Sequence, residues 1–311
     1  MQKIQTVALI GMGAIGSFFG PRLHAALGDN FWLIASGERR KRLETRGVTI
    51  NGVKYIFPIH EPSDTEKADL VIISTKEMGL DTALEDIRNC VDEHTLILPL
   101  LNGIESEERT AAVYGWDRVL YSYMRMPIVM KDGVTNFDPN GGFIAFGEKE
   151  NTVLSERVQI INELFDRCGI PHKNPEDMIH GMWFKFLMNV GENMTCALLG
   201  VPYGAYCSSE DANYFRLSAM DEVTAIAAKK GITLGEEEYA ELRRILDRVD
   251  PSSKPSTLQD IEAGRPTEAA IFSGTIMRLG KELGVPTPVN ALLYHGIRVL
   301  EQKNAGLIKG L

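Results

Sequence analysis

The chain has 311 residues, of which 44% are hydrophobic and 24% charged. This balance is typical of a globular protein, and the length favours two domains. The formal net charge of −9 argues against non-specific binding to nucleic acid or anionic lipid. The sequence contains neither an apolar run of membrane-helix length nor a secretory signal pattern, so we expect a cytoplasmic protein without a membrane or nucleic-acid partner.

Cysteine and histidine do not show the spacing of a metal site. The four cysteines include no Cys-x-x-Cys pair, and the six histidines include no His-x-x-x-His pair. Scattered cysteines fit reduced thiols better than a disulfide framework. We therefore expect no protein-bound metal.

The first predicted elements are an apolar strand at 5–10 and a helix at 17–26, joined by a Gly-x-Gly-x-x-Gly loop. Between a strand and a helix, this spacing indicates a dinucleotide-binding turn, with a ligand-free glycine turn as the alternative. Gly11 would make the tight turn, Gly13 would admit a pyrophosphate, and Gly16 would allow close packing of helix on strand. The helix N-terminus would offer N–H groups to the phosphates. The predicted cofactor loop comprises Gly11, Met12, Gly13, Ala14, Ile15 and Gly16.

Further apolar runs alternate with helical segments through the first half of the chain. Because these runs are rich in β-forming residues and do not alternate between apolar and polar, they predict central strands of a parallel sheet that is covered on both faces. The runs lie at 31–34, 53–57, 70–74 and 95–98.

The next segments predict extra strands at the edge of this sheet. A long strand region is expected at 118–130, and two strands at 134–137 and 143–146 flank a strong turn signal. An amphipathic helix at 152–168 closes the domain, and a linker with two prolines follows at 169–175.

Beyond this linker nearly every segment has helical periodicity. We therefore predict an α/β fold in two domains. Residues 1–172 form an N-terminal Rossmann-like dinucleotide-binding domain with extra edge strands, and residues 173–311 form a mostly α-helical substrate and catalytic domain. The expected helices lie at 177–199, 210–230, 236–248, 267–284 and 288–303.

The segment after the second strand indicates which nicotinamide cofactor binds. An acidic residue there favours NAD, whereas an arginine accommodates the additional phosphate of NADP. The strand is not followed directly by an acid, and four cations occupy 39–42. Ser36 and Arg39 are the predicted phosphate ligands, with Arg40 as the alternative, and NADPH is the predicted cofactor. A solvated basic helix face is the competing interpretation, and Glu38 argues for NADH.

Polar side chains also follow two predicted strands and line one predicted helix. Lys76 and Asn102 lie at carboxyl ends of strands, where open α/β sheets bind ligands. Lys185, Asn189 and Asn193 recur every four residues, which would place them in one stripe on an otherwise apolar helix. Buried polar groups require partners, so the stripe contacts either a substrate or neighbouring helices, and Lys185 could also extend to solvent.

These features, in this order, resemble the ketopantoate reductase (2-dehydropantoate 2-reductase) family over nearly the whole chain. The similar segments are the glycine loop, Ser74-Thr75-Lys76, Leu101-Asn102-Gly103, Trp183-x-Lys185-x-x-x-Asn189-x-x-x-Asn193, Ser256-x-Leu258-Gln259-Asp260-Ile261 and Arg265-x-Thr267-Glu268.

The resemblance implies transfer of a hydride from NADPH to the ketone of ketopantoate, which gives pantoate for pantothenate biosynthesis. Lys185 would be the general acid at the ketone oxygen, and burial would lower its pKa. Glu268 would orient Lys185 and bind substrate.

The family's remaining roles concern binding. Asn189 and Asn193 would contact the hydroxyl end of the substrate, and Ser256 its carboxylate. Lys76 and Asn102 would position the nicotinamide ribose and the substrate. The partner implied is a small-molecule 2-keto acid, and a homodimer is left open.

Some of these residues also have purely structural interpretations. Ser256 and Gln259 fit a Ser-x-x-Gln capping box. Glu268 follows Thr267, a candidate N-cap, and would favour a helix dipole without any catalysis.

The chain departs from the family pattern after Glu268, where Ala270 and Ser273 replace an acid and an asparagine. Ser36 likewise stands where the phosphate-binding arginine is expected. Two alternatives therefore remain: a paralogous NAD(P)H-dependent reductase of another branched 2-keto acid, and an NADPH-binding regulator without turnover.

Overall fold

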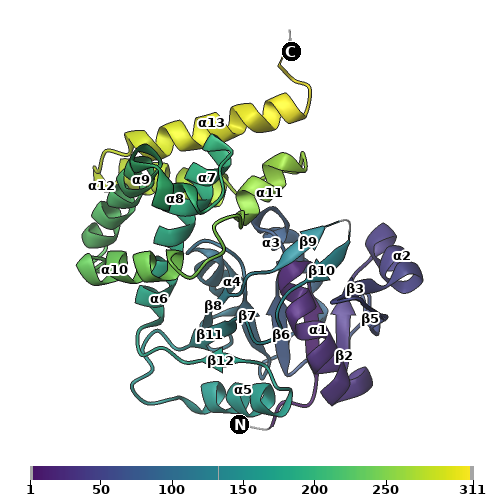
Figure 1. Ribbon diagram of the computed structural model, residues 1–311. Helices are drawn as coiled ribbons and strands as arrows, with labels where there is room; N and C mark the ends of the chain where they lie inside the picture. The colour runs from purple at the N-terminus through teal and green to yellow at the C-terminus, as the bar shows by residue number, and fades with distance from the viewer. Residues whose placement is uncertain (1–2, 132, 309–311) are drawn as a thin grey trace. The chain divides into compact units, whose positions relative to one another are not determined.

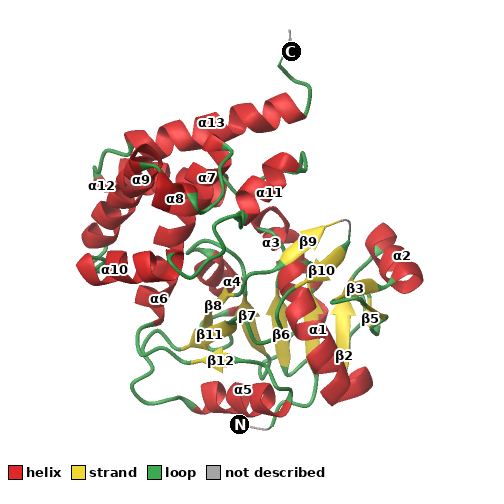
Figure 2. Ribbon diagram, viewed as in Figure 1, coloured by secondary structure: helices red, strands yellow, loops and turns green. Residues whose placement is uncertain are grey.

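The computed structural model describes residues 3–131 and 133–308. The chain forms two compact units, Met1–Ile179 and His180–Leu311 (Figure 1). The first unit alternates strands with helices, and the second is built from helices (Figure 2). The boundary expected between residues 172 and 173 lies inside strand β12 (His172–Lys173) of the first unit.

A five-stranded sheet in the order β5-β2-β1-β6-β7 forms the centre of the first unit. Every neighbouring pair in it is parallel. This order reverses direction at β1 and is that of a Rossmann-type sheet, so the predicted fold class is confirmed. The strands are β1 (Val7–Ile10), β2 (Phe31–Ile34), β5 (Ile59–His60), β6 (Leu70–Ile73) and β7 (Leu96–Pro99).

The central strands are buried on both faces, which explains their continuous apolar sequence. In β1, Val7 and Leu9 belong to a core with Phe19 of helix α1, whereas Ile10 packs with Leu84 of helix α3 in a second core. Figure 2 shows α1 lying across the strands of this sheet. The helices are α1 (Ala14–Leu27), α2 (Gly37–Arg46), α3 (Leu80–Asp86), α4 (Ser106–Tyr114) and α5 (Glu156–Arg167), with 3₁₀ turns η1 (Gly28–Asn30), η2 (Glu77–Gly79) and η3 (Arg88–Cys90).

The remaining strands form two smaller sheets, in the orders β4-β3-β10-β9 and β12-β11-β8. The strand expected at 53–57 is β4, which pairs antiparallel with β3 and is not in the parallel sheet. The expected region 118–130 is two strands, β8 and β9. These sheets comprise β3 (Val48–Ile50), β4 (Val53–Tyr55), β8 (Tyr121–Arg125), β9 (Val129–Lys131), β10 (Val134–Asn136), β11 (Phe143–Gly147) and β12.

The strands expected at 134–137 and 143–146 do not pair with each other. β10 pairs with β9 and β3, whereas β11 pairs with β8 and β12. An isolated parallel bridge between Ile97 and Val119 connects the segment before β8 to β7, so extra strands do adjoin that edge. Residues 169–175 do not form a free linker, because they supply β12 and because Asn174 donates to the Phe146 carbonyl.

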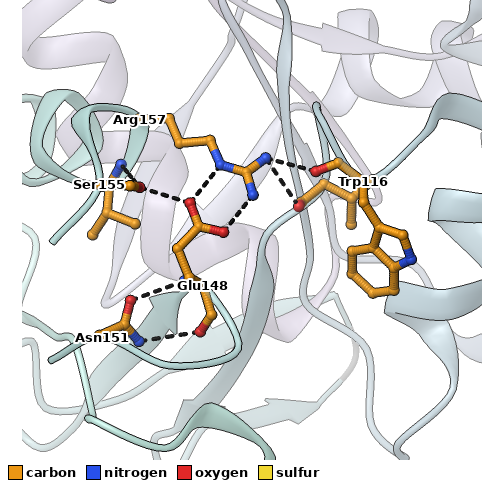
Figure 3. A network of polar contacts seen from close by, with 7 residues as sticks. Trp116, Glu148, Asn151, Ser155 and Arg157 are labelled. Atoms are coloured by element: carbon orange, nitrogen blue, oxygen red, sulfur yellow. Dashed lines mark hydrogen bonds and ion pairs between the residues drawn. The ribbon is translucent and has the colours of Figure 1, made fainter. Parts of the chain in front are cut away.

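An ion pair between Glu148 and Arg157 ties β11 to helix α5 (Figure 3). The Arg157 guanidinium also donates to the Trp116 carbonyl over 2.7 Å, and the Ser155 hydroxyl donates to the Glu148 carboxylate over 2.6 Å. Asn151 accepts from the Glu148 amide over 2.9 Å. Burial by itself would raise the pKa of Glu148, but the hydrogen bonds from Arg157 and Ser155 outweigh it and lower that pKa.

This lowered pKa predicts acid sensitivity. A carboxylate whose pKa is lower in the folded state stabilises the protein above its unfolded pKa, and this contribution is lost as pH falls through the folded pKa. We expect Glu148→Gln to lower the free energy of unfolding at pH 7 by about 1–3 kcal/mol and to weaken its fall below about pH 4.3. Denaturant titrations across pH would measure this, with Glu38→Gln, in an exposed pair with Lys41, as the control. Equal curves for both variants would contradict it.

The second unit packs around helix α9, which contacts α7, α8, α12 and α13. The helices expected at 210–230, 236–248 and 288–303 are present as α9, α10 and α13, whereas those at 177–199 and 267–284 each contain a π-helical turn. No described helix is long and apolar enough to cross a membrane. The elements are α6 (Met178–Met188), which begins in the first unit, then η4 (Asn189–Asn193), α7 (Met194–Leu199), α8 (Ala205–Ser208), α9 (Glu210–Lys229), α10 (Glu236–Leu246), α11 (Ser256–Glu262), η5 (Ala270–Gly274), α12 (Thr275–Leu283) and α13 (Pro288–Asn304).

Candidate active site

The loop between β1 and α1 has a shape that only glycine allows at its first position. Gly11 has a φ of +101°, and a Cβ there would lie 2.5 Å from backbone atoms of Ser74 and Thr75. The Gly13 amide donates to the Gly11 carbonyl over 2.8 Å, which closes a tight turn. The Ser74 hydroxyl donates to the same carbonyl over 2.8 Å, so the end of β6 holds the loop in place.

The other two loop glycines differ from each other in their surroundings. A Cβ at Gly16 would lie 2.6 Å from the Gly11 carbonyl oxygen, so α1 could not approach β1 so closely with any other residue. A Cβ at Gly13 would have no atom within 4 Å, and Gly13 is the N-cap of α1. The loop therefore has an open face at a helix N-terminus, which fits the pyrophosphate of a dinucleotide. The other predicted loop residues, Met12, Ala14 and Ile15, are partly exposed.

The candidate phosphate ligands after β2 differ in their exposure and in their ion pairs. Ser36 is exposed at the N-cap of α2, and Arg39 is exposed in its first turn. Arg40 instead forms ion pairs with Glu44 and Glu61 at 2.6 and 2.8 Å. The structure gives Arg39 no ion pair among the described residues. Arg39 is therefore the more available of the two arginines.

Lys76 and Asn102 follow adjacent strands of the parallel sheet. β6 pairs with β7 and with β1, so the segments after these three strands leave the sheet at its carboxyl edge. Lys76 is exposed, and Asn102 is half-buried beside Gly103, which has a φ of +98°. The first unit thus brings together on one sheet edge all of its predicted site segments: the glycine loop, Ser36 with Arg39, Lys76 and Asn102.

In the second unit the polar stripe runs through a π-helical turn. Lys185 is half-buried on α6, while Asn189 and Asn193 begin and end η4 with exposed fractions of 6% and 7%. The uniform α-helical spacing expected for the stripe is therefore wrong beyond Asn189. The Asn193 amide donates to the Asn189 side-chain oxygen over 3.4 Å and accepts from the Tyr203 hydroxyl over 3.3 Å.

The segments that carry Glu268 and Ser256 both reach this turn. Half-buried Glu268 lies just before η5, and η5 contacts η4. Phe272 of η5 also packs near Phe186 of α6, with 6.4 Å between the ring centroids. Exposed Ser256 is the first residue of α11, which also contacts η4. The second unit therefore brings the predicted substrate residues onto neighbouring elements.

The predicted capping box at Ser256 is wrong. Pro255 is the N-cap of α11, and the Gln259 side chain donates to the Lys254 carbonyl over 2.8 Å. Thr267, in contrast, does accept from the Ala269 amide over 3.2 Å, as an N-cap would.

Three residues of this region were not predicted from the sequence: Glu192, Arg216 and Tyr203. Glu192 lies within η4, and its carboxylate is 2.8 Å from the guanidinium of Arg216 on α9. Tyr203 bonds to Asn193, as described above. A signal for Glu192 does exist in the sequence, because an acid within an apolar helical segment requires a partner.

Ser273, one of the departures from the family pattern, has a structural role. Its buried hydroxyl donates to the Asn290 side chain over 2.9 Å, and Asn290 in turn donates to Glu222. The described residues hold no group of three His, Cys, Asp or Glu side chains arranged for a metal.

The parallel sheet and the glycine loop at its first turn define a Rossmann-type dinucleotide-binding protein. Residues 7–151 match the sequence model described as Ketopantoate reductase PanE/ApbA, and residues 177–301 match Ketopantoate reductase PanE/ApbA C terminal. The two matches leave little of the chain uncovered. The chain belongs to the ketopantoate reductase PanE/ApbA family.

Known proteins are similar to this chain over nearly its whole length. A 2-dehydropantoate 2-reductase of Pyrococcus horikoshii is 28% identical over 306 residues, covering 96% of this chain and 99% of the relative. A PanE/ApbA family ketopantoate reductase from Ralstonia eutropha has the same fold, with a TM-score of 0.83, 24% identity and coverage of 96% and 99%. A D-mandelate dehydrogenase in complex with NADH and anilino(oxo)acetate has a TM-score of 0.84, 25% identity and the same coverage.

Proposed function

We propose that this protein is an NADPH-dependent 2-dehydropantoate 2-reductase, which reduces ketopantoate to pantoate in pantothenate biosynthesis. The observation that carries the proposal is the arrangement of the second unit. There the helix that carries Lys185 continues directly into the turn with Asn189 and Asn193. That turn contacts η5, which begins just after Glu268. Family membership of both halves of the chain supports it.

The proposed chemistry needs a proton donor at the ketone oxygen. When bound, NADPH supplies the hydride that adds to the ketone carbon, and negative charge then develops on the oxygen. The Lys185 ammonium stabilises this charge and donates its proton to the oxygen. Glu268 orients the ammonium and binds substrate. Because the interaction strengthens as charge develops, it lowers the barrier more than it aids binding of the ketone.

The other proposed roles are in binding. Asn189 and Asn193 hydrogen-bond to the hydroxyl end of the substrate, and Ser256 binds its carboxylate. In the first unit, the loop at residues 11–16 holds the pyrophosphate against the N-terminus of α1. Ser36 and Arg39 bind the additional phosphate of NADPH, and Lys76 and Asn102 position the nicotinamide ribose and the substrate.

The direct test is oxidation of NADPH by the purified protein with ketopantoate, with NADH run in parallel. Rapid oxidation with NADPH supports both substrate and cofactor. If the protein binds NADPH but oxidises it neither with ketopantoate nor with any other 2-keto acid tested, a regulator without turnover is favoured instead.

A second candidate is a paralogous NAD(P)H-dependent reductase of another branched 2-keto acid. The similar D-mandelate dehydrogenase was solved with NADH, so the fold also serves other substrates and that cofactor. A panel of 2-keto acids separates the candidates, because a paralogue would turn over another member of the panel with higher kcat/KM than ketopantoate. A cytoplasmic location and the homodimer stay predictions.

The available arginine after β2 gives a cofactor prediction. We expect Arg39→Ala to raise the KM for NADPH roughly 10-fold or more while leaving that for NADH unchanged, because it removes a charged hydrogen bond to the additional phosphate. Arg40→Ala is the control, since Arg40 is engaged with Glu44 and Glu61. Steady-state kinetics with both cofactors measures the effect. A larger rise for Arg40→Ala would assign the phosphate to that residue.

A further inference from the structure

The turn that carries Asn189 and Asn193 is π-helical, and this unusual shape requires an explanation. A π-helix is rare, and its i→i+5 hydrogen bonds displace the residues that follow from their α-helical positions. Here the π-helical turn covers Asn189–Asn193 and continues directly into α7. The placement of Asn193 relative to Lys185 therefore depends on this turn being kept.

Side chains bond to two backbone carbonyls within the turn. The Thr195 hydroxyl donates to the Gly191 carbonyl over 2.5 Å, and the Tyr206 hydroxyl donates to the Glu192 carbonyl over 2.7 Å. The Thr195 and Tyr206 hydroxyls also contact each other; because each has a single proton, only two of these three contacts are donated hydrogen bonds at any one time. Insertion of side chains into the helical ladder is an established cause of local distortion. Burial raises the pKa of Tyr206 well above its ordinary value, so its hydroxyl keeps its proton.

The Glu192 side chain of this turn is held by Arg216 of helix α9. Its carboxylate pairs with the Arg216 guanidinium at 2.8 Å, and each side chain is 5% exposed. Arg216 also lies over the Tyr206 ring, 5.2 Å from its centroid, and bonds to Asn213 over 3.2 Å. Arg216 thus holds both Glu192 and the tyrosine that bonds to the Glu192 carbonyl.

Helix α9, which supplies Arg216, also packs tightly against the turn. A Cβ at Gly191 would lie 2.4 Å from the Met220 side chain. The turn is therefore held by the close approach of the Met220 side chain to Gly191, by the Thr195 and Tyr206 hydroxyls, and by the buried Glu192–Arg216 ion pair. Buried pairs seldom add net stability over apolar replacements, and a structural role that specifies one conformation is a better explanation for this one.

We propose that Glu192 and Arg216 are positioning residues, which keep the Asn189–Asn193 turn π-helical and so set where Asn189 and Asn193 meet the substrate. The substrate part of this inference rests on the proposed function. Neither residue need touch the keto acid, since both act through the backbone of the turn.

The test removes the pair without leaving a buried charge. A single substitution would strand one ion and destabilise the fold, whereas the double variant Glu192→Gln with Arg216→Met keeps the volume and buries no net charge. We expect the KM for ketopantoate to rise roughly 10- to 100-fold, because small misplacements of binding groups have effects of this size. The Kd for NADPH, measured by fluorescence titration, should stay within about twofold, since the pair belongs to the second unit and the nucleotide-binding loop to the first.

Glu222→Gln is the matched control. Glu222 is a buried acid of the same helix, and it accepts from the Val289 and Asn290 amides at the start of α13. Its loss should lower the melting temperature without raising the KM for ketopantoate. A double variant with the wild-type KM, or with no more effect on KM than Glu222→Gln, would overturn the proposal.

A crystal structure of the double variant provides a readout that does not depend on activity. We expect residues 189–193 to adopt α-helical hydrogen bonding and Asn193 to be displaced. A retained π-helical turn would refute the positioning role, even if the wild-type protein failed to reduce ketopantoate. Failure to reduce ketopantoate together with the expected displacement would instead leave the structural role intact and reject only the proposed substrate.

Discussion

Lys185→Ala is expected to lower kcat for ketopantoate by at least about a hundredfold, the scale of a lost general acid. The reason is that the ketone oxygen would lose the ammonium that is proposed to protonate it as its charge develops. The KM should change less than kcat, because the interaction is strongest in the transition state. Stopped-flow and steady-state measurements of NADPH oxidation would give both constants.

Lys281→Ala is the control for this prediction. Lys281 is an exposed lysine in the last turn of α12, and its removal should leave both constants unchanged. A Lys185→Ala protein that is folded, as circular dichroism would show, and still turns over at a near-normal rate would remove Lys185 from the chemistry. The proton donor would then have to be sought among other groups.

The central sheet could be predicted because its physical signal is local. Runs such as Leu70–Ile73 are apolar at every position, and burial on both faces of a parallel sheet is what such runs require. The glycine loop was also predictable, because its Gly-x-Gly-x-x-Gly spacing lies directly between an apolar strand and a helix. In both cases, one short segment contains the whole constraint.

The pairing of the smaller sheets could not be predicted in the same way. A strong turn signal separates β10 from β11, yet the two strands do not pair with each other, and each has other partners. β10 pairs with β3, whose sequence lies far away and is too short to stand out. Pairing of this kind depends on which edges are open after the central sheet has formed, and hydrophobic patterning alone does not encode that.

The π-helical turn shows the same limit at the candidate site. The i, i+4 spacing of Asn189 and Asn193 is compatible with a regular α-helix, and the departure from it occurs where side chains of α8 and α9 contact the turn. Tyr206 and Arg216, which make those contacts, are distant in sequence and carry no motif. The sequence was therefore enough to propose candidate site residues, whereas the local geometry of the segment that carries Asn189 and Asn193 could not be predicted from it.

The second large expected effect concerns the open glycine of the nucleotide loop. Gly13→Ala should raise the Kd for NADPH roughly 10- to 100-fold, because the added methyl group would occupy the face where the pyrophosphate bonds to backbone N–H groups. The free energy of unfolding should change by no more than about 1 kcal/mol, since the new Cβ meets no atom within 4 Å and the φ of −103° suits alanine. Fluorescence titration with NADPH and denaturant unfolding would measure the two quantities.

Two other glycines make this prediction selective. Gly235 is also an open helix N-cap, with a φ of −139°, so Gly235→Ala should match Gly13→Ala in stability but bind NADPH as the wild type does. Gly11→Ala should instead lower stability strongly, because its Cβ would meet the backbone of Ser74 at 2.5 Å. If Gly13→Ala binds NADPH with unchanged affinity, the pyrophosphate does not lie on this loop, and the agreement between its shape and a dinucleotide would have to be explained by helix packing alone.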